Sequence, residues 1–247
     1  EIAQSESRSS TNFANFWIHN NLINFDNQKM SKSLGNIIKG RDFINDYNSE
    51  IFKFLILSVH YRSVLNFNKK LINQTIINLI KIYSALSLAE KLSNSNVEVK
   101  ESKEYKNAFD VYSKKASGFI NSDLNTPGFF SVVFDIVRKF NLEAVNKKPS
   151  GELKYFSICL LDFFNTYGGF LGLFQESKNE FILDLNLLIL KNKNIDVVDI
   201  EGAIEKRDKA RKQKDYILSD KIRDKLNSKG IELKDNPDGT TGWSVRV

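Results

Sequence analysis

Along the middle of the chain, apolar residues recur at three- and four-residue intervals, and polar stretches interrupt this pattern. That spacing places the apolar side chains on one face of an α-helix. Asn68 can cap the first helix, and Thr126 at the N-cap before Pro127 is a strong start signal for the third. Helices joined by polar connections predict an antiparallel bundle. The four predicted helices cover about residues 68–92, 104–122, 126–145 and 152–174.

Shorter elements flank this bundle. Before it, residues 12–25 predict a short helix and then a strand, and apolar positions at helical spacing predict helices over 37–47 and 49–60. After it, Gly230 is placed to end a helical hairpin, and the turn at 236–239 separates two short strands. The hairpin covers about residues 199–213 and 215–229, and the strands cover 231–233 and 243–247.

Composition narrows the class of protein. The chain has 247 residues and 41% hydrophobic content, which is enough for a substantial core. Its one cysteine, Cys159, lies in an apolar run, so it excludes an internal disulfide and fits a reducing compartment. No apolar run approaches the ~20 residues that cross a bilayer, and the polar first residues contain no signal-peptide core. We therefore expect a cytoplasmic protein that contacts no membrane.

Positive charge is concentrated near the end of the sequence. The formal net charge is +6, with a pI near 9.1. Between Lys206 and Lys229 there are ten Lys or Arg and four Asp, an excess equal to the net charge of the whole chain. This concentration is the electrostatic footprint of a nucleic-acid surface. A solvated helical hairpin is the alternative.

A short basic segment is the strongest candidate for chemistry, with two lysines, two serines and a glycine within eight residues. Lysine ammonium groups are compact phosphate ligands, and hydroxyl and backbone N–H groups add further donors. In nucleotidyl transfer, such groups stabilise the charge on a departing pyrophosphate. An exposed basic loop is the alternative reading. The segment is Lys29-Met30-Ser31-Lys32-Ser33-Leu34-Gly35-Asn36.

This string resembles KMSKS, the second signature of the class I aminoacyl-tRNA synthetases. The resemblance implies that Lys29 and Lys32 are catalytic, because they would stabilise the transition state in which an amino acid reacts with ATP. ATP would enter as a substrate together with Mg²⁺. The residues that the resemblance assigns to ATP binding are Lys29, Met30, Ser31, Lys32 and Ser33.

The first residues, Glu1-Ile2-Ala3-Gln4-Ser5, read like the inside of a helix and resemble a run in the cysteinyl-tRNA synthetases. In that family the matching glutamate is one of four ligands of a zinc ion that grips the substrate thiolate, since zinc favours soft sulfur. The resemblance makes Glu1 a metal ligand of an intact enzyme that holds one zinc per subunit. The other ligands, two Cys and a His, would come from outside this chain, and a lone glutamate is no metal site.

Each of three further polar groups has two possible interpretations. His19 is either catalytic or a structural residue that holds the loop. The run His60-Tyr61-Arg62-Ser63 is either a catalytic cluster or a helix cap and domain connection. Asp123 and Asn125 are either an acid or metal pair or the capping and turn residues of an Asp-x-Asn-Thr-Pro string. All three segments resemble cysteinyl-tRNA synthetases, in which the bundle leans on the inner curve of the tRNA.

The end of the chain resembles the anticodon-binding domain of the same family. Carboxylates can accept hydrogen bonds from guanine, arginines can donate to bases and phosphates, and an aromatic ring can stack on an unpaired base. We therefore expect Asp220 and Asp235 to read bases, Arg211 to act as a cationic clamp and Tyr216 to stack. Capping is the alternative for Asp215 and Asp235. The matching pattern includes Arg207, Ala210, Arg211, Asp215, Tyr216, Asp220, Arg223, Asp224, Leu226, Gly230, Leu233, Asp235, Gly239, Thr240 and Trp243.

Together these resemblances identify the chain as the C-terminal half of a member of the cysteinyl-tRNA synthetases, with a mostly α fold. Residues 1–60 would be the end of a Rossmann-type α/β catalytic domain that carries the KMSKS loop. Residues 61–175 would form an antiparallel helical bundle that contacts the tRNA stem, and 176–198 a linker with a short helix. Residues 199–247 would form a small α+β anticodon-binding domain.

The family activates cysteine with ATP and then moves the cysteinyl group to tRNA-Cys, so this activity is implied for the intact protein, as a monomer. The first ATP signature of the family is absent from this chain, and we expect the chain alone to be inactive. One alternative is the related ligase that joins cysteine to an aminosugar, which should lack the basic tail after Asp199. The other is a non-catalytic tRNA-binding fragment.

Overall fold

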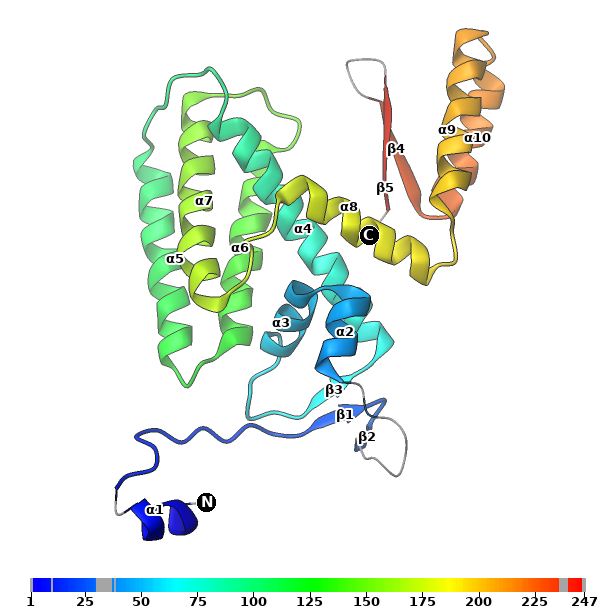
Figure 1. Ribbon diagram of the computed structural model, residues 1–247. Coiled ribbons are helices and arrows are strands. Elements are labelled where there is room, and N and C mark those ends of the chain that lie inside the picture. Colours follow the sequence, from blue (N-terminus) through cyan, green and yellow to red (C-terminus); the bar gives the residue numbers. More distant parts are fainter. Residues whose placement is uncertain (1, 10, 30–36, 38, 236–239, 246–247) are drawn as a thin grey trace.

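The computed structural model describes residues 2–9, 11–29, 37, 39–235 and 240–245 (Figure 1). The expectation of a mostly α fold is confirmed. The described residues also form two small sheets, one near each end of the chain. Helices α4–α7 lie side by side on one side of the molecule, and α9, α10 and the second sheet lie on the other. None of the helices in these ranges is long and apolar enough to cross a membrane.

A small sheet opens the folded part of the chain, with the strand order β2-β1-β3. Asp26 and Asn27 turn β1 into β2 with φ of 46° and 63°, the left-handed values that a two-residue hairpin needs and that Asp and Asn tolerate. Strand β3 pairs parallel with β1, with Asn24 opposite Asn66. The elements up to β3 are α1 (Ile2–Ser9), β1 (Ile23–Phe25), β2 (Gln28–Lys29), α2 (Gly40–Tyr47), α3 (Ser49–Leu57) and β3 (Leu65–Phe67).

The short helix expected after residue 12 was wrong, because residues 11–22 contain no helix. This stretch is rich in asparagine, whose side chain competes for backbone hydrogen bonds and disfavours helix interiors. Its aromatic residues also lack a surface to pack on, and Phe16 is 88% exposed. Instead, the Asn21 backbone N–H donates to the Tyr61 carbonyl at 2.8 Å, which guides the chain toward β1.

The four predicted bundle helices are confirmed. Asn68 caps α4 as expected, with its side chain accepting from the Leu71 N–H at 2.8 Å. The expected cap of α6 is corrected by one residue: Asn125, not Thr126, accepts from the Gly128 N–H at 2.9 Å. Aromatic rings fill much of the core between the helices. The helices are α4 (Lys69–Ser93), α5 (Lys103–Asn121), α6 (Thr126–Ala144) and α7 (Gly151–Leu171).

Beyond the bundle, helix α8 (Lys178–Asn192) occupies most of the stretch expected as a linker with a short helix. It packs along α4 and contacts β5. The helical hairpin and the two strands that follow are confirmed, with β4 and β5 paired antiparallel and Leu233 opposite Trp243. These elements are α9 (Val197–Lys212), α10 (Tyr216–Ser228), β4 (Ile231–Asp235) and β5 (Thr241–Val245).

Candidate functional site

The hairpin β1–β2 leads into the basic segment. Lys29, its first lysine, is the last residue of β2 and pairs with Asn24 of β1. The turn before it is tied to β3, since the Asn27 N–H donates to the Asn66 side chain at 2.8 Å. The structure therefore fixes how the chain enters the segment. The other residues assigned to ATP binding lie outside the described residues, and these are Met30, Ser31, Lys32 and Ser33.

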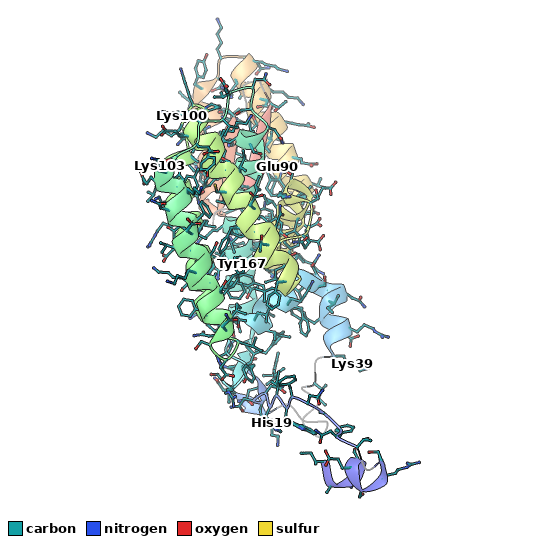
Figure 2. The ribbon with its side chains drawn as sticks, turned by 90° about the vertical axis from the view of Figure 1, so that its left-hand side faces the viewer. His19, Lys39, Glu90, Lys100, Lys103 and Tyr167 are labelled. Atoms are coloured by element: carbon teal, nitrogen blue, oxygen red, sulfur yellow. The ribbon has the colours of Figure 1, made fainter. Side chains whose placement is uncertain are left out.

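Helices α2 and α3 carry the chain from the basic segment into the bundle. Lys39 lies at the start of α2 (Figure 2). The ring of Phe43, which is buried, packs against Phe52 of α3 and edge-on against Phe67 of β3, with centroids 5.3 and 5.2 Å away. Aromatic packing thus joins α2 to both α3 and the sheet.

A buried carboxylate attaches α3 to α4 and to the turn that follows α7. Glu50, which is 2% exposed, accepts on Oε1 from the Tyr83 hydroxyl at 2.6 Å and from the Phe174 backbone N–H at 2.8 Å. One turn further, the Lys53 ammonium donates to the Gly172 carbonyl at 2.6 Å. Burial raises the pKa of Glu50, although its two hydrogen bonds oppose that effect. We call this group the Glu50 joint.

Sequence reasoning missed the Glu50 joint. A glutamate in the first turn of a helix is ordinary helix chemistry, because it complements the helix dipole. The available signal was its setting, since Glu50 directly precedes a strongly apolar run that includes Ile51, Phe54 and Leu55. An acid within such a buried segment indicates a specific partner.

The three polar groups with open interpretations have different surroundings. Asp123 bonds to Arg62 Nε at 2.7 Å and to the Tyr61 hydroxyl at 2.5 Å, and these two bonds hold its pKa at about 2. Asn125 instead caps α6, so the structure favours turn and capping chemistry over a metal pair. His19 lies on the extended segment before β1, with its ring stacked beside Trp17 (Figure 2).

At the other end of the described chain, three arginines converge on one carboxylate. Arg207 holds Asp235 with both terminal nitrogens, at 2.8 and 3.0 Å. Arg211 and Arg223 each add one bond, at 3.1 and 3.0 Å. Thr241 completes the group by donating to Asp208 at 3.1 Å and accepting from Arg207 at 3.1 Å. We call Arg207, Arg211 and Arg223, together with Asp235, the arginine cluster.

Burial and charge differ among these groups. The Arg207 side chain is 3% exposed, whereas those of Arg211 and Arg223 are 46% and 39% exposed. The hydrogen bonds from Arg207 hold the pKa of Asp235 at about 2, because they stabilise its ionised form. Asp235 therefore carries a full negative charge at neutral pH.

The remaining predicted anticodon residues lie on α10. Tyr216 is the first residue of the helix and is well exposed, as a stacking ring needs to be. Asp220 is exposed four residues later, which places both on the same helical face. Asp215 caps α10 by accepting from the Leu218 N–H at 3.0 Å, so its capping alternative is the one observed. The structure thus brings all four predicted anticodon residues onto the same hairpin and adjoining strand.

The expected metal ligand, Glu1, lies outside the described residues. Within the parts of the chain that the structure describes, no three His, Cys, Asp or Glu side chains come together as a metal site. The described residues alone therefore do not fit a zinc ion.

Comparison with known proteins agrees with this arrangement. Residues 1–77 match the family "tRNA synthetases class I (C) catalytic domain", and residues 119–175 match the DALR domain family. Over 246 residues, 99% of its length, the chain is 36% identical to a cysteine–tRNA ligase of Bdellovibrio bacteriovorus. The chain is thus similar to cysteine–tRNA ligases along almost its whole length. It spans about half the length of this relative, since the match covers 51% of it.

The two family matches fall on different parts of the fold. The catalytic-domain match contains the basic segment and the Glu50 side of the joint, and the DALR match contains α6, α7 and the Phe174 side. The Glu50 joint therefore connects the two matched regions. The arginine cluster lies outside both matches but inside the similarity to the ligase, which extends over nearly the whole chain.

Proposed function

We propose that this chain is the C-terminal part of an ATP-dependent cysteine–tRNA ligase. The observation that carries this proposal is the 36% identity to such a ligase along 99% of the chain. The intact enzyme would activate cysteine with ATP and Mg²⁺, release pyrophosphate and transfer the cysteinyl group to tRNA-Cys. We further propose that it acts as a cytoplasmic monomer and that this chain alone does not catalyse the reaction.

In this proposal the basic segment acts on the phosphates. Lys29 and Lys32 would donate hydrogen bonds to ATP as charge develops on the pyrophosphate, and the segment's hydroxyl and backbone donors would orient it. The hairpin that positions Lys29, and the packing of Phe43 of α2 on α3 and β3, would hold the two ends of the segment. Glu1 would supply one zinc ligand in the intact enzyme, and zinc would bind the substrate thiolate.

The anticodon would be read at the other end of the chain. Tyr216 would stack on an unpaired base, Asp220 and Asp235 would serve base recognition, and Arg211 would donate to bases or phosphates. The charged hairpin after Asp199 supports this reading over a ligase that joins cysteine to an aminosugar, because a small sugar needs no such surface.

Changing Lys32 in the full-length enzyme tests the proposal. We expect Lys32→Ala to lower the rate of cysteine-dependent ATP–pyrophosphate exchange by about 10²–10³-fold, as for the loss of one transition-state donor. Affinity for tRNA-Cys should stay nearly unchanged. Lys70→Ala, which removes an exposed lysine on α4, is the matched control and should leave exchange unaltered. Loss of tRNA binding with normal exchange would show that the assigned role is wrong.

A further inference from the structure

The carboxylate at the centre of the arginine cluster is already fully engaged. The two oxygens of Asp235 accept hydrogen bonds from three guanidinium groups. The Thr241 hydroxyl also lies 3.3 Å from Oδ1 of Asp235. A carboxylate offers about four acceptor positions. A base that bonded directly to Asp235 would therefore have to displace an arginine.

The three arginines are not equivalent. Arg207 is buried and directs both terminal nitrogens at Asp235, so it has a structural role. Arg211 and Arg223 are partly exposed, and the bonds described above use one nitrogen of each. A guanidinium has five N–H donors, so each can donate to a further acceptor while it remains bound to Asp235.

Position along α10 places Arg223 with the residues expected to meet RNA. Tyr216, Asp220 and Arg223 follow one another at intervals of four and three residues, which aligns them on one face of the helix. Arg211 approaches the same carboxylate from α9. Two partly exposed guanidiniums thus bond to opposite oxygens of one fixed anion, and an exposed aromatic ring lies about two helical turns before Arg223 on the same helix.

The charge of the cluster favours an acceptor-rich ligand. Three guanidiniums meet Asp235, and the Asp208 carboxylate lies 3.9 Å from Arg207, so these five side chains carry a net charge of +1. Phosphate oxygens and the O6 and N7 edge of guanine are the acceptors that arginine contacts best in nucleic acids. The exposed donors of the cluster therefore suit RNA, whereas the oxygens of the central carboxylate are already bonded to the arginines.

From this geometry we infer that Arg223 is a further residue that contacts and discriminates the tRNA anticodon, and that Asp235 is a positioning residue that holds Arg211 and Arg223. This inference rests on the proposed function, because it assumes that the hairpin binds tRNA. It changes the expected role of Asp235 from reading a base directly to fixing the side chains that do.

The test uses the full-length enzyme with Arg223→Met, which keeps the apolar stem and leaves the pair between Arg207 and Asp235 intact. Aminoacylation is measured with a tRNA-Cys transcript and with transcripts that carry single anticodon substitutions. We expect kcat/KM for the cognate transcript to fall by about 5- to 150-fold, the effect of one good base contact. The preference for the cognate transcript over at least one substituted transcript should fall equally, with ATP–pyrophosphate exchange unchanged.

A matched variant separates specific contact from general charge. Lys225 is an exposed cation on the same helix, and it lines a groove with Ile200 that contains no member of the arginine cluster. We expect Lys225→Met to lower kcat/KM by less than about threefold, and equally for all transcripts. The inference is overturned if Arg223→Met behaves in this way, or if it has no effect while the enzyme still charges tRNA-Cys. Failure of the wild-type enzyme to charge tRNA-Cys would instead refute the proposed function.

The positioning role has its own test, a double-variant cycle between Asp235→Asn and Arg223→Met. If Asp235 acts through Arg223, the double variant should lose anticodon discrimination by much less than the product of the two single losses. Independent base reading by Asp235 would give the full product and overturn this part of the inference. Asp235→Glu, which keeps the negative charge beside buried Arg207, replaces Asp235→Asn if thermal unfolding shows a destabilised module.

Discussion

Two carboxylates hold different parts of this molecule together, and their surroundings are opposite. Glu50 is buried and bonds to a hydroxyl and a backbone N–H, both neutral donors. Asp235 is partly exposed and bonds to three positively charged guanidiniums. The Glu50 joint connects the segment after the lysines to the bundle, whereas the arginine cluster connects α9, α10 and the second sheet.

The difference shows in the ionisation of the two groups. Burial raises the pKa of Glu50, while the arginines lower the pKa of Asp235 to about 2. Burial disfavours the ionised form of Glu50, whereas the neighbouring guanidiniums favour the ionised form of Asp235. The same chemical group therefore acts as a fixed structural joint in one place and as the centre of a charged surface in the other.

Removing the Glu50 carboxylate should have the largest effect on stability. Glu50→Ala leaves the Tyr83 hydroxyl and the Phe174 N–H without their acceptor in a buried site, so we expect a loss of about 2–5 kcal/mol in the free energy of unfolding. Urea denaturation of the chain measures it. Glu50→Gln keeps an acceptor oxygen and should cost clearly less. Equal losses for the two variants would show that packing, not hydrogen bonding, holds the joint.

Removing the buried arginine should have a smaller effect, because two other cations remain on Asp235. We expect Arg207→Met to lower the free energy of unfolding by about 1–3 kcal/mol, the range for hydrogen bonds to charged groups. Its control is Arg138→Met, which breaks an exposed pair with Asp135 and should stay within the ~0–1 kcal/mol of surface ion pairs. If both variants lost equally little, burial of Arg207 would contribute nothing to the cluster.

The smallest effect, and the most direct contrast, is the pH dependence of stability. The lowered pKa of Asp235 stabilises the fold above an ordinary carboxyl pKa of about 4, and this stabilisation is lost as pH falls toward about 2. The raised pKa of Glu50 has the opposite sign: its contribution is full below an ordinary glutamate pKa and is lost as pH rises through the folded-state pKa.

Urea midpoints across a pH series check these two signs. Asp235→Asn should flatten the loss of stability on the acid side, between about pH 4 and pH 2. Glu50→Gln should flatten a decline on the other side, above about pH 4. The comparison fails if both variants change the profile in the same direction.

Much of this fold follows from local sequence signals. The apolar period of α4 and its capping residue Asn68 predicted that helix to within a residue at each end. The α6 cap was displaced because Asp123 and Leu124 both adopt left-handed φ, which brings Asn125 to the start of the helix. The sequence correctly indicated that a helix starts here, but the geometry of the turn determined which side chain caps it.

Contacts between distant segments could not be predicted in this way. The partner of Glu50 at Phe174 lies 124 residues away, and no spacing rule connects them. The sequence pattern predicted Arg211 and Asp235 as two separate residues that contact the anticodon. Only the tertiary structure, in which α10 packs on both α9 and β4, shows that the two side chains bond to each other. The side chains of a site can be expected from a motif, but their mutual bonding depends on tertiary structure.

Helix α8 belongs to two hydrophobic cores at once. Phe181 and Leu185 are buried in the core of the bundle, Leu190 is buried in the small core beside β4 and β5, and Ile189 packs against both. Asn186, between them, accepts from the Val245 N–H at 3.2 Å. Unfolding of α8 would expose both cores together. The bundle and the C-terminal module should therefore unfold as one cooperative unit rather than as two independent domains.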